Sequence, residues 1–238
     1  MRYSIPDAAK IQPSGEVRIP ARAVLLEGAL QFPPEAQGIV VFAHGSGSSR
    51  FSPRNQSVAR SLRSRGFGTL LFDLLTRQEE ALDQRTAHLR FDIGLLAERL
   101  MDATRWLLDT TDLGGPAIGY FGASTGAGAA LMAAAELGES IGAVVSRGGR
   151  PDLAATALPR VKSPTLLIVG ALDEAVIRLN EQALALLSTE KRLEIVPGAS
   201  HLFEEPGTLT EVARLAGAWF ERYLSISSAH SRPAPPTP

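Results

Sequence analysis

Residues 117–137 read AIGYFGASTGAGAALMAAAEL, and this stretch decides the fold class. An apolar run of strand length, a glycine-rich turn around Ser124 and a run of small helix-forming residues follow one another directly. Gly122 and Gly126 stand two positions on either side of Ser124, where only small residues leave room for a sharp turn from strand to helix. The stretch predicts a strained Ser124 whose hydroxyl is lifted out of a sheet, at the positive end of a helix dipole. A glycine-rich turn that merely packs a helix closely on a strand is the alternative.

Short apolar runs recur on both sides of this stretch. Most are apolar at every position, as the strands of a parallel sheet buried on both faces are. The runs are Gly38–Ala43, Thr69–Phe72, Ala117–Gly122, Ala143–Ser146, Thr165–Val169 and Leu193–Val196. Ahead of them, Glu16–Pro33 predicts two antiparallel strands at one edge of the sheet.

Helical periodicity fills the segments between the runs. One face of a long helix is predicted by apolar residues spaced three and four apart, and the other by charged residues. The apolar face carries Ile93, Leu96, Leu100, Ala103 and Leu107, and the charged face carries Asp92, Glu98, Arg99, Asp102 and Arg105. A second such helix near the end is marked by Val212, Leu215, Trp219 and Tyr223. Alternating strands and helices predict right-handed crossovers with helices on both faces of the sheet.

These patterns predict an α/β fold with a mostly parallel sheet of about eight strands, helices on both faces and no lid domain. The 238 residues suit one domain, or at most two small ones. No internal repeat or linker divides the chain, so we expect a single domain over residues 1–225. The proline-rich segment 226–238 is expected to be a disordered tail or a polyproline helix, and docking on an SH3-like partner is the less favoured alternative.

Composition and charge exclude several classes of protein. Basic and acidic residues number 24 and 25, a balance without the electrostatic footprint of a nucleic-acid or anionic-membrane binder. The absence of cysteine excludes disulfides, thiolate nucleophiles, zinc fingers and iron–sulfur clusters. No apolar run approaches the ~18–20 residues of a membrane span, and no signal-peptide pattern opens the chain. We expect a cytoplasmic protein acting on a small molecule without cofactor or metal; its oligomeric state is not predicted.

A serine nucleophile needs a base, and the chain has four histidines to offer. His201 is the best candidate, because it lies in the loop VPGASHLF between the run LEIV and the last helix. His230 falls in the tail and His88 in a polar stretch. A surface-loop histidine without function is the alternative for His201. His44 is expected to brace a loop by hydrogen bonding rather than to act as the base.

The base in turn needs a carboxylate to fix its tautomer. Asp173 ends the segment TLLIVGALD, at the carboxyl end of a predicted strand, where open α/β sheets place their sites. Glu174 is expected to open the next helix instead, since an acid is favoured at a helix N-terminus. Asp152 is expected to be a helix N-cap, and Asp73 precedes the nucleophile in the chain. Asp173 is therefore the predicted acid.

The segment His44–Gly47 follows the run GIVVFA directly. A loop at this place can aim a backbone N–H at the oxyanion that forms during acyl transfer. The natural donors are the amides of Ser46 and Thr125. A flexible Gly/Ser loop without a role is the alternative.

Two arginines and one charged segment complete the candidates. Arg147 and Arg150 follow a strand and are candidate ligands for a substrate carboxylate, the alternative being ion pairs with local acids such as Asp152. The polar stretch Arg50–Asn55 carries the same ambiguity. Leu74–Arg90 is interpreted either as a flap over the site or as a solvated loop.

The segments VVFAHGSGSS, IGYFGASTGAGAAL, PTLLIVGALDEAV and VPGASHLFEEPG, in this order, resemble the α/β-hydrolase superfamily and its small dienelactone hydrolase-like branch, over roughly residues 16–225. The resemblance implies that Ser124 is the nucleophile, Asp173 the acid and His201 the base, with Ser46 and Thr125 as oxyanion donors. Dienelactone hydrolases proper use a cysteine nucleophile, which this chain lacks, so a serine esterase is the better interpretation.

The expected function is hydrolysis of a carboxylic ester or lactone through an acyl-serine intermediate. The same residues would also serve an acyltransferase, a thioesterase or an amidase. A non-catalytic binding module on the same fold is a further alternative, although such modules often lose one of the three catalytic residues.

Overall fold

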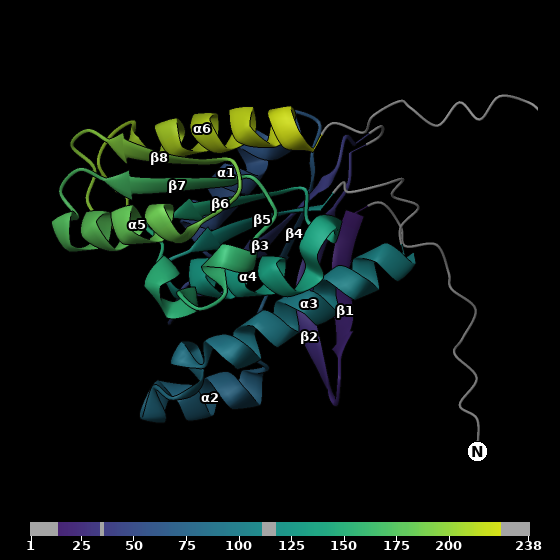
Figure 1. Cartoon of the computed structure of the whole chain (residues 1–238). Helices are drawn as coiled ribbons and strands as arrows, with labels where there is room; N and C mark the ends of the chain where they lie inside the picture. The colour runs from purple at the N-terminus through teal and green to yellow at the C-terminus, as the bar shows by residue number, and fades with distance from the viewer. Residues whose placement is uncertain (1–13, 34–35, 111–117, 225–238) are drawn as a thin grey trace, which may run out of the picture.

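A single sheet of eight strands forms the centre of the molecule. The computed structural model describes residues 14–33, 36–110 and 118–224, so the predicted proline-rich tail lies outside the described residues. The strands are β1 (Ser14–Ala21), β2 (Val24–Gln31), β3 (Ile39–Ala43), β4 (Gly68–Phe72), β5 (Ile118–Ala123), β6 (Ala143–Arg147), β7 (Thr165–Gly170) and β8 (Lys191–Val196). They lie in the order β1-β2-β4-β3-β5-β6-β7-β8 (Figure 1).

Strand direction follows the sequence pattern. The six neighbouring strands β4-β3-β5-β6-β7-β8 are parallel to one another. Of these, β3, β4 and β5 are buried at every residue. β1 and β2 are antiparallel to each other, and β2 is antiparallel to β4. The predicted α/β class, the antiparallel edge and the sheet of eight strands are confirmed.

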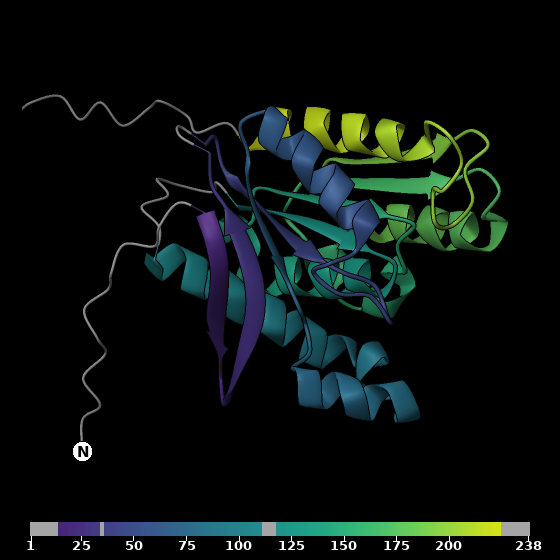
Figure 2. The ribbon, with the colours of Figure 1, turned by 180° about the vertical axis from the view of Figure 1, so that it is seen from behind.

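Helices cover both faces of the sheet (Figures 1 and 2). Their bounds are α1 (Pro53–Ser64), α2 (Arg77–Thr86), α3 (Ile93–Thr110), α4 (Thr125–Leu137), α5 (Glu174–Leu186) and α6 (Thr208–Tyr223). The buried hydrophobic residues of α1 and α6 belong to one apolar cluster with Val40 and Phe121. Most of the buried hydrophobic residues of α3, α4 and α5 belong to a second cluster with Val41 and Tyr120, on the opposite face. None of the helices in the described ranges has the length and apolar character needed to cross a membrane.

Arg99 departs from the predicted pattern of α3. The sequence places it on the solvent face, but the structure buries it, with only 8% of its surface exposed. Its Nη1 donates to the carbonyl of Ala21 at 3.0 Å, and its Nη2 donates to Glu79 at 2.9 Å. The reason is that α3 packs against β1 as well as against α4, so this part of its charged face is covered.

The connection from β6 to β7 holds no lid domain, as predicted, but its local structure differs from the expectation. Instead of a helix capped by Asp152 it forms two 3₁₀ turns, Pro151–Ala154 and Leu158–Arg160. Asp152 lies inside the first turn and is not an N-cap, because that turn begins one residue earlier, after Arg150. The Nε and Nη2 atoms of Arg150 donate to the two carboxylate oxygens of Asp152. This ion pair explains why Asp152 faces Arg150 and not a helix end.

The charged segment 74–90 is mainly helical. α2 begins with a capping box, in which Thr76 accepts from the Glu79 amide and Glu79 accepts from the Thr76 amide. The buried carboxylate of Asp83 then fixes the turn after α2 by accepting from the amides of Leu89 and Arg90 and from the Arg90 side chain. The hydrogen bonds at both ends make this segment a structured element rather than a solvated loop.

Candidate active site

Ser124 stands at the sharp turn between β5 and α4. Its backbone adopts φ 51° and ψ −123°, a conformation that side chains other than glycine rarely take. A Cβ on Gly122 would overlap Ala127, and one on Gly126 would overlap the carbonyl of Ala43. Both glycines are therefore required by close backbone contacts, as the sequence suggested.

The end of β6 holds this turn in place. The Ser124 amide donates to the carbonyl of Arg147 at 3.2 Å, and the Ser124 carbonyl accepts from the amide of Arg150 at 3.0 Å. These bonds replace the regular ladder at the point where the chain leaves the sheet. They account for a strained conformation that persists in a non-glycine residue.

His201 and Asp173 meet beside the turn. Asp173 lies between β7 and α5, and His201 follows β8; His201 Nδ1 and Asp173 Oδ2 are 2.6 Å apart. Because an ionised carboxylate only accepts, this contact places the proton on Nδ1 and leaves the Nε2 lone pair free. The backbones at Gly170 and Ala199 can come this close because Gly170 has no side chain. A Cβ on Gly170 would overlap the carbonyl of Ala199.

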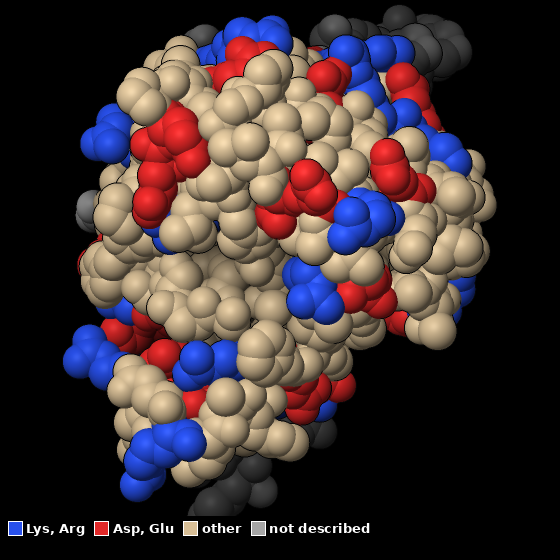
Figure 3. All heavy atoms as spheres, turned by 90° about the vertical axis from the view of Figure 1, so that its left-hand side faces the viewer, with Lys and Arg blue, Asp and Glu red and all other residues tan. Residues whose placement is uncertain are grey.

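Ser124 and His201 line one cavity of about 240 Å³ at the carboxyl ends of the strands. Figure 3 faces this side of the molecule and shows it hollowed, with basic and acidic side chains around the rim. Among the described residues, no hydrogen bond joins the two side chains, as is common in structures without substrate. The remaining lining residues are Gly45, Ser46, Ser48, Ser52, Arg54, Asn55, Ala123, Arg147 and Leu202.

The two predicted oxyanion donors are neighbours but differ in their bonding. The amide of Ser46 donates to the hydroxyl of Thr125 at 2.9 Å, so it is occupied in this state. Thr125 is the first residue of α4, and the first N–H groups of a helix have no acceptor within it. Ser46 lines the Ser124 cavity and Thr125 follows Ser124 directly in the chain; within the described ranges, only the Ser46 amide of the two has a hydrogen-bond acceptor.

His44 braces the loop that carries Ser46. Its Nδ1 lies 3.0 Å from the carbonyl of Gly45, and its Nε2 accepts from the Leu74 amide at 3.1 Å. The imidazole is therefore neutral, with its proton on Nδ1. Burial lowers the pKa of His44, which favours the same state. The hydrogen-bonding role predicted for this histidine is the one the structure shows.

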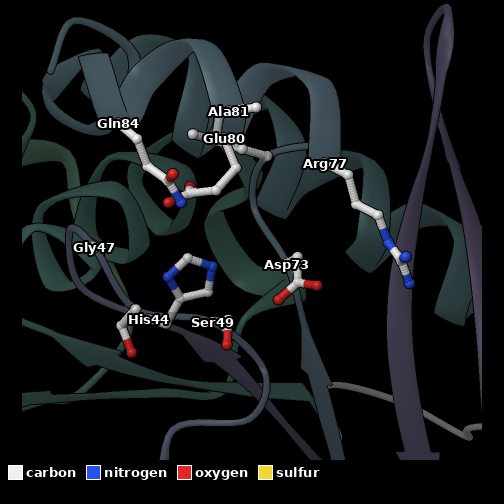
Figure 4. Close-up of a pocket in the computed structure, with 10 residues that line it drawn as sticks. His44, Gly47, Ser49, Asp73, Arg77, Glu80, Ala81 and Gln84 are labelled. Atoms are coloured by element: carbon white, nitrogen blue, oxygen red, sulfur yellow. The ribbon is translucent and has the colours of Figure 1, made fainter. Parts of the chain in front are cut away.

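A second cavity, of about 400 Å³, lies behind the same loop. Figure 4 shows His44 on its floor and Glu80 and Gln84 of α2 above it. Ser124 does not line this cavity, so α2 covers the back of the loop and not the Ser124 cavity. The side chains around it are those of His44, Ser48, Ser49, Asp73, Leu75, Arg77, Glu80, Ala81 and Gln84.

The structure separates the two candidate arginines. Arg150 forms a two-point ion pair with Asp152, at 2.8 and 2.7 Å, and does not line the Ser124 cavity. Arg147 lines that cavity and is buried, with its guanidinium carbon 5.7 Å from the centre of the Phe203 ring. Burial and the nearby charge of Arg54 lower the pKa of Arg147 to about 10.

Three further lining residues carried only a weak sequence signal. Ser52, Arg54 and Asn55 belong to the first turn of α1 or cap it, and they lie in the polar stretch 50–55 that follows the His44–Gly47 loop. Their place after a strand-end loop suggested a role, but only the packing of α1 against the sheet shows that they reach the cavity. Among the described residues, no cluster of three His, Asp or Glu side chains could hold a metal ion.

Two curated proteins are similar to most of this chain in sequence. Two curated relatives from Mycobacterium tuberculosis strains, CDC 1551 / Oshkosh and H37Rv, carry the provisional name phosphoribosyl transferase and are 56% identical over 209 residues. The match covers 88% of this chain but 46% of each relative, so the chain spans about half their length.

Solved structures give the same fold. The crystal structure of a dienelactone hydrolase from Anabaena variabilis is 61% identical, with a TM-score of 0.84, and the match covers 89% of this chain and 99% of that one. Est1E from Butyrivibrio proteoclasticus, at 16% identity and a TM-score of 0.74 over 88% of this chain and 98% of its own, shares the fold. The model of the dienelactone hydrolase family matches residues 26–226. The chain belongs to the dienelactone hydrolase family.

Proposed function

We propose that the chain is a serine hydrolase that cleaves a carboxylic ester or lactone through an acyl-serine intermediate. The observation that carries the proposal is the strained Ser124, which shares one cavity with a His201 whose Nδ1 is held by Asp173. With Nδ1 engaged by Asp173, Nε2 of His201 serves as the base in this proposal. The α/β-hydrolase fold and the family membership support hydrolase chemistry in general.

In the proposed first step, Ser124 Oγ attacks the ester carbonyl while His201 Nε2 takes the hydroxyl proton. The carbonyl oxygen becomes negatively charged and accepts hydrogen bonds from the amides of Thr125 and Ser46. To donate to this oxygen, the Ser46 amide gives up its hydrogen bond to the Thr125 hydroxyl. His201 then returns the proton to the departing alcohol. A water molecule repeats the sequence on the acyl-serine and releases the acid.

The name of the mycobacterial relatives does not decide the function of this chain. Phosphoribosyl transfer is named there for proteins of about twice the matched length, of which this chain matches 46%. The residues at the Ser124 cavity suit acyl chemistry instead. Acyl transfer, thioester cleavage and amide cleavage remain distinguishable by substrate.

Labelling with a fluorophosphonate tests the nucleophile directly. We expect the wild type to be labelled and Ser124→Ala to lose both the label and its turnover of p-nitrophenyl esters, by roughly 10⁴- to 10⁶-fold. Ser48→Ala is the matched control, because Ser48 lines the same cavity and has no role in the proposed steps. Circular dichroism checks that both variants fold.

A panel of esters, lactones and thioesters then defines the reaction, with hydroxylamine added as an acyl acceptor. Preferential formation of hydroxamate would favour a transferase over a hydrolase. If Ser124→Ala retains more than a tenth of the wild-type turnover, the assignment of the nucleophile is wrong. If the wild type takes no label and cleaves no member of the panel, the fold serves binding only.

A further inference from the structure

Arg147 is a buried charge without a carboxylate partner. Only 7% of its surface is exposed. Among the described residues, its side chain forms no ion pair within 4.0 Å, and its Nε lies buried without a hydrogen-bond acceptor. The other two buried arginines differ in this respect, since Arg50 pairs with Asp73 and Glu27, and Arg99 pairs with Glu79.

An unpaired buried charge destabilises a folded protein, because desolvation is not compensated by an opposite charge. Burial lowers the pKa of Arg147 to about 10, so the guanidinium is still protonated at neutral pH. Its cation–π contact with Phe203, at 5.7 Å, replaces only a small part of the lost hydration. A buried arginine that pays this desolvation penalty without an acidic partner is typical of a binding site in which the ligand supplies the negative charge.

Two more positive groups converge on the same cavity. Arg54, the second residue of α1, lines it and has a buried Nε without an acceptor. Its Nη1 pairs at 3.1 Å with Glu204, whose side chain is 64% exposed. The positive end of the α1 dipole also faces the cavity, because the N-cap residue Ser52 lines it. No Asp or Glu is among the described residues that line the cavity.

The number and directions of these donors distinguish between anions. One guanidinium already satisfies both oxygens of a carboxylate through its two parallel N–H groups. Here Arg147 approaches from the end of β6, whereas Arg54 and the first turn of α1 approach from another element. A phosphate monoester offers three free oxygens and about −1.5 to −2 charges, which matches donors arriving from separate directions.

We propose that the Ser124 cavity binds a phosphate group carried by the ester substrate, with Arg147 and Arg54 as its ligands. The inference rests on the proposed function in that the ester carbonyl lies at Ser124 while the phosphate is held and not cleaved. It makes Arg147 a specificity-determining residue that selects phosphorylated esters.

Binding of inorganic phosphate to Ser124→Ala tests the site apart from any turnover. We expect calorimetry to detect phosphate binding, and adding Arg147→Met to weaken it roughly 10- to 100-fold, the range of a charge-assisted hydrogen bond. Adding Arg150→Met instead is the matched control and leaves the affinity unchanged, because Arg150 already pairs with Asp152. Absence of phosphate binding overturns the proposal, and acetate binding as tightly as phosphate overturns the choice of anion. Since this variant is inactive by design, neither result bears on whether Ser124 is the nucleophile.

Matched substrates test the specificity. The p-nitrophenyl esters of butyrate, glutarate (one free carboxylate) and 4-phosphonobutyrate differ chiefly in the terminal group. We expect kcat/KM to be highest for the phosphonate ester, and Arg147→Met to reduce the ratio of phosphonate to butyrate kcat/KM by roughly 10- to 100-fold through KM. A wild type that prefers butyrate or glutarate contradicts the proposal.

Stability separates a binding role from a structural one. Because Arg147 is buried without a partner, Arg147→Met should raise Tm while it weakens phosphate binding. A structural arginine would behave in the opposite way. A fall in Tm with unchanged phosphate affinity would show that Arg147 serves the fold and not a ligand.

Discussion

At the residue scale, Asp173 and Asp152 both lie after strands of the sheet, but their partners give them different roles. Asp173 accepts a hydrogen bond from His201, whereas Asp152 accepts from both Nε and Nη2 of Arg150. We expect Asp173→Asn to lower kcat/KM by up to ~10⁴-fold, since an amide can hold the wrong tautomer of His201. Asp152→Asn should stay within a few-fold of the wild type, because a partly exposed ion pair contributes only about 0–1 kcal/mol. Equal losses in the two variants would mean that the acid has been misplaced.

His44 makes the stability of the fold depend on pH. Burial lowers its pKa, so the folded protein resists a proton that the unfolded chain accepts below about pH 6.5. Its contribution to the unfolding free energy is therefore complete above that pH and is lost as the pH falls toward the lowered pKa. Between pH 7.5 and 5.5 we expect the wild type to lose up to about 1.4 kcal/mol more than His44→Gln, measured by urea unfolding.

His88→Gln is the control for this measurement, because His88 is exposed and precedes only a short 3₁₀ turn. Its stability should follow the wild type across the same pH range. If His44→Gln shows the same pH dependence as the wild type, protonation of His44 is not what destabilises the fold in mild acid.

Single residues also mark the limit of prediction from sequence. His44 was predicted to brace its loop because it precedes the loop's donor, and the hydrogen bonds agree. Arg99 was misplaced because helical periodicity does not reveal that β1 covers part of the charged face of α3. Whether an arginine near the end of β6 forms a local ion pair also depends on packing. Arg150 pairs with Asp152, whereas Arg147, the last residue of β6, has no acidic partner among the described residues.

At the scale of elements, the strand–turn–helix unit depends on the close approach of α4 to β3. A Cβ on Gly126 would overlap the carbonyl of Ala43, and neither backbone can shift without disturbing the sheet. We expect Gly126→Ala to destabilise the protein by at least roughly 1–3 kcal/mol in chemical unfolding and to displace Ser124 enough to reduce turnover. Gly15→Ala is the control, since a Cβ there meets nothing within 4 Å, and its stability should be unchanged or slightly higher. A Gly126→Ala variant as stable as Gly15→Ala would contradict this account of the turn.

The elements differ in how well the sequence predicts them. The strands of the parallel part were found within two residues, because burial on both faces gives most of them an unbroken apolar run. The largest shift is at β8, an edge strand whose first two residues are charged and exposed. The local structure of the β6–β7 connection was not predicted, because residues 148–164, with three prolines, fit several short turns equally well. For the charged segment 74–90, the sequence did not decide between a flap over the site and a solvated loop. Its capping box shows that a helix begins there but not what the helix covers.

At the scale of the whole molecule, the sheet gathers at one edge residues that are distant in sequence. Ser124, Asp173 and His201 follow β5, β7 and β8, and the Ser46 loop follows β3. That parallel strands end at a common edge can be predicted from their order in the chain. The charge of the resulting cavity cannot be predicted in this way. It depends on how α1 packs on the face of the sheet opposite to α4, which brings Arg54 near Arg147.

The same cavity sets the size of the acyl group. It measures about 240 Å³, and only Ala123 and Leu202 among its lining residues have apolar side chains. A buried methylene stabilises a complex by about 0.8 kcal/mol only where apolar walls receive it. The larger cavity behind the Ser46 loop offers no extension, since most of its lining is polar or charged and Ser124 does not border it. No lid stands between β6 and β7 to add an apolar cover.

We therefore expect p-nitrophenyl esters to be cleaved best with short acyl chains, about C2–C6, and without a jump in rate at the solubility limit. Specificity constants from C2 to C16 measure the preference. Leu202→Ala is the informative variant, because removing the larger apolar wall should reduce the advantage of C4 and C6 over C2 while leaving C2 nearly unchanged. A maximum at C10 or beyond would require an apolar groove elsewhere in the molecule, and interfacial activation would require a mobile cover; either result would contradict an open, mainly polar site.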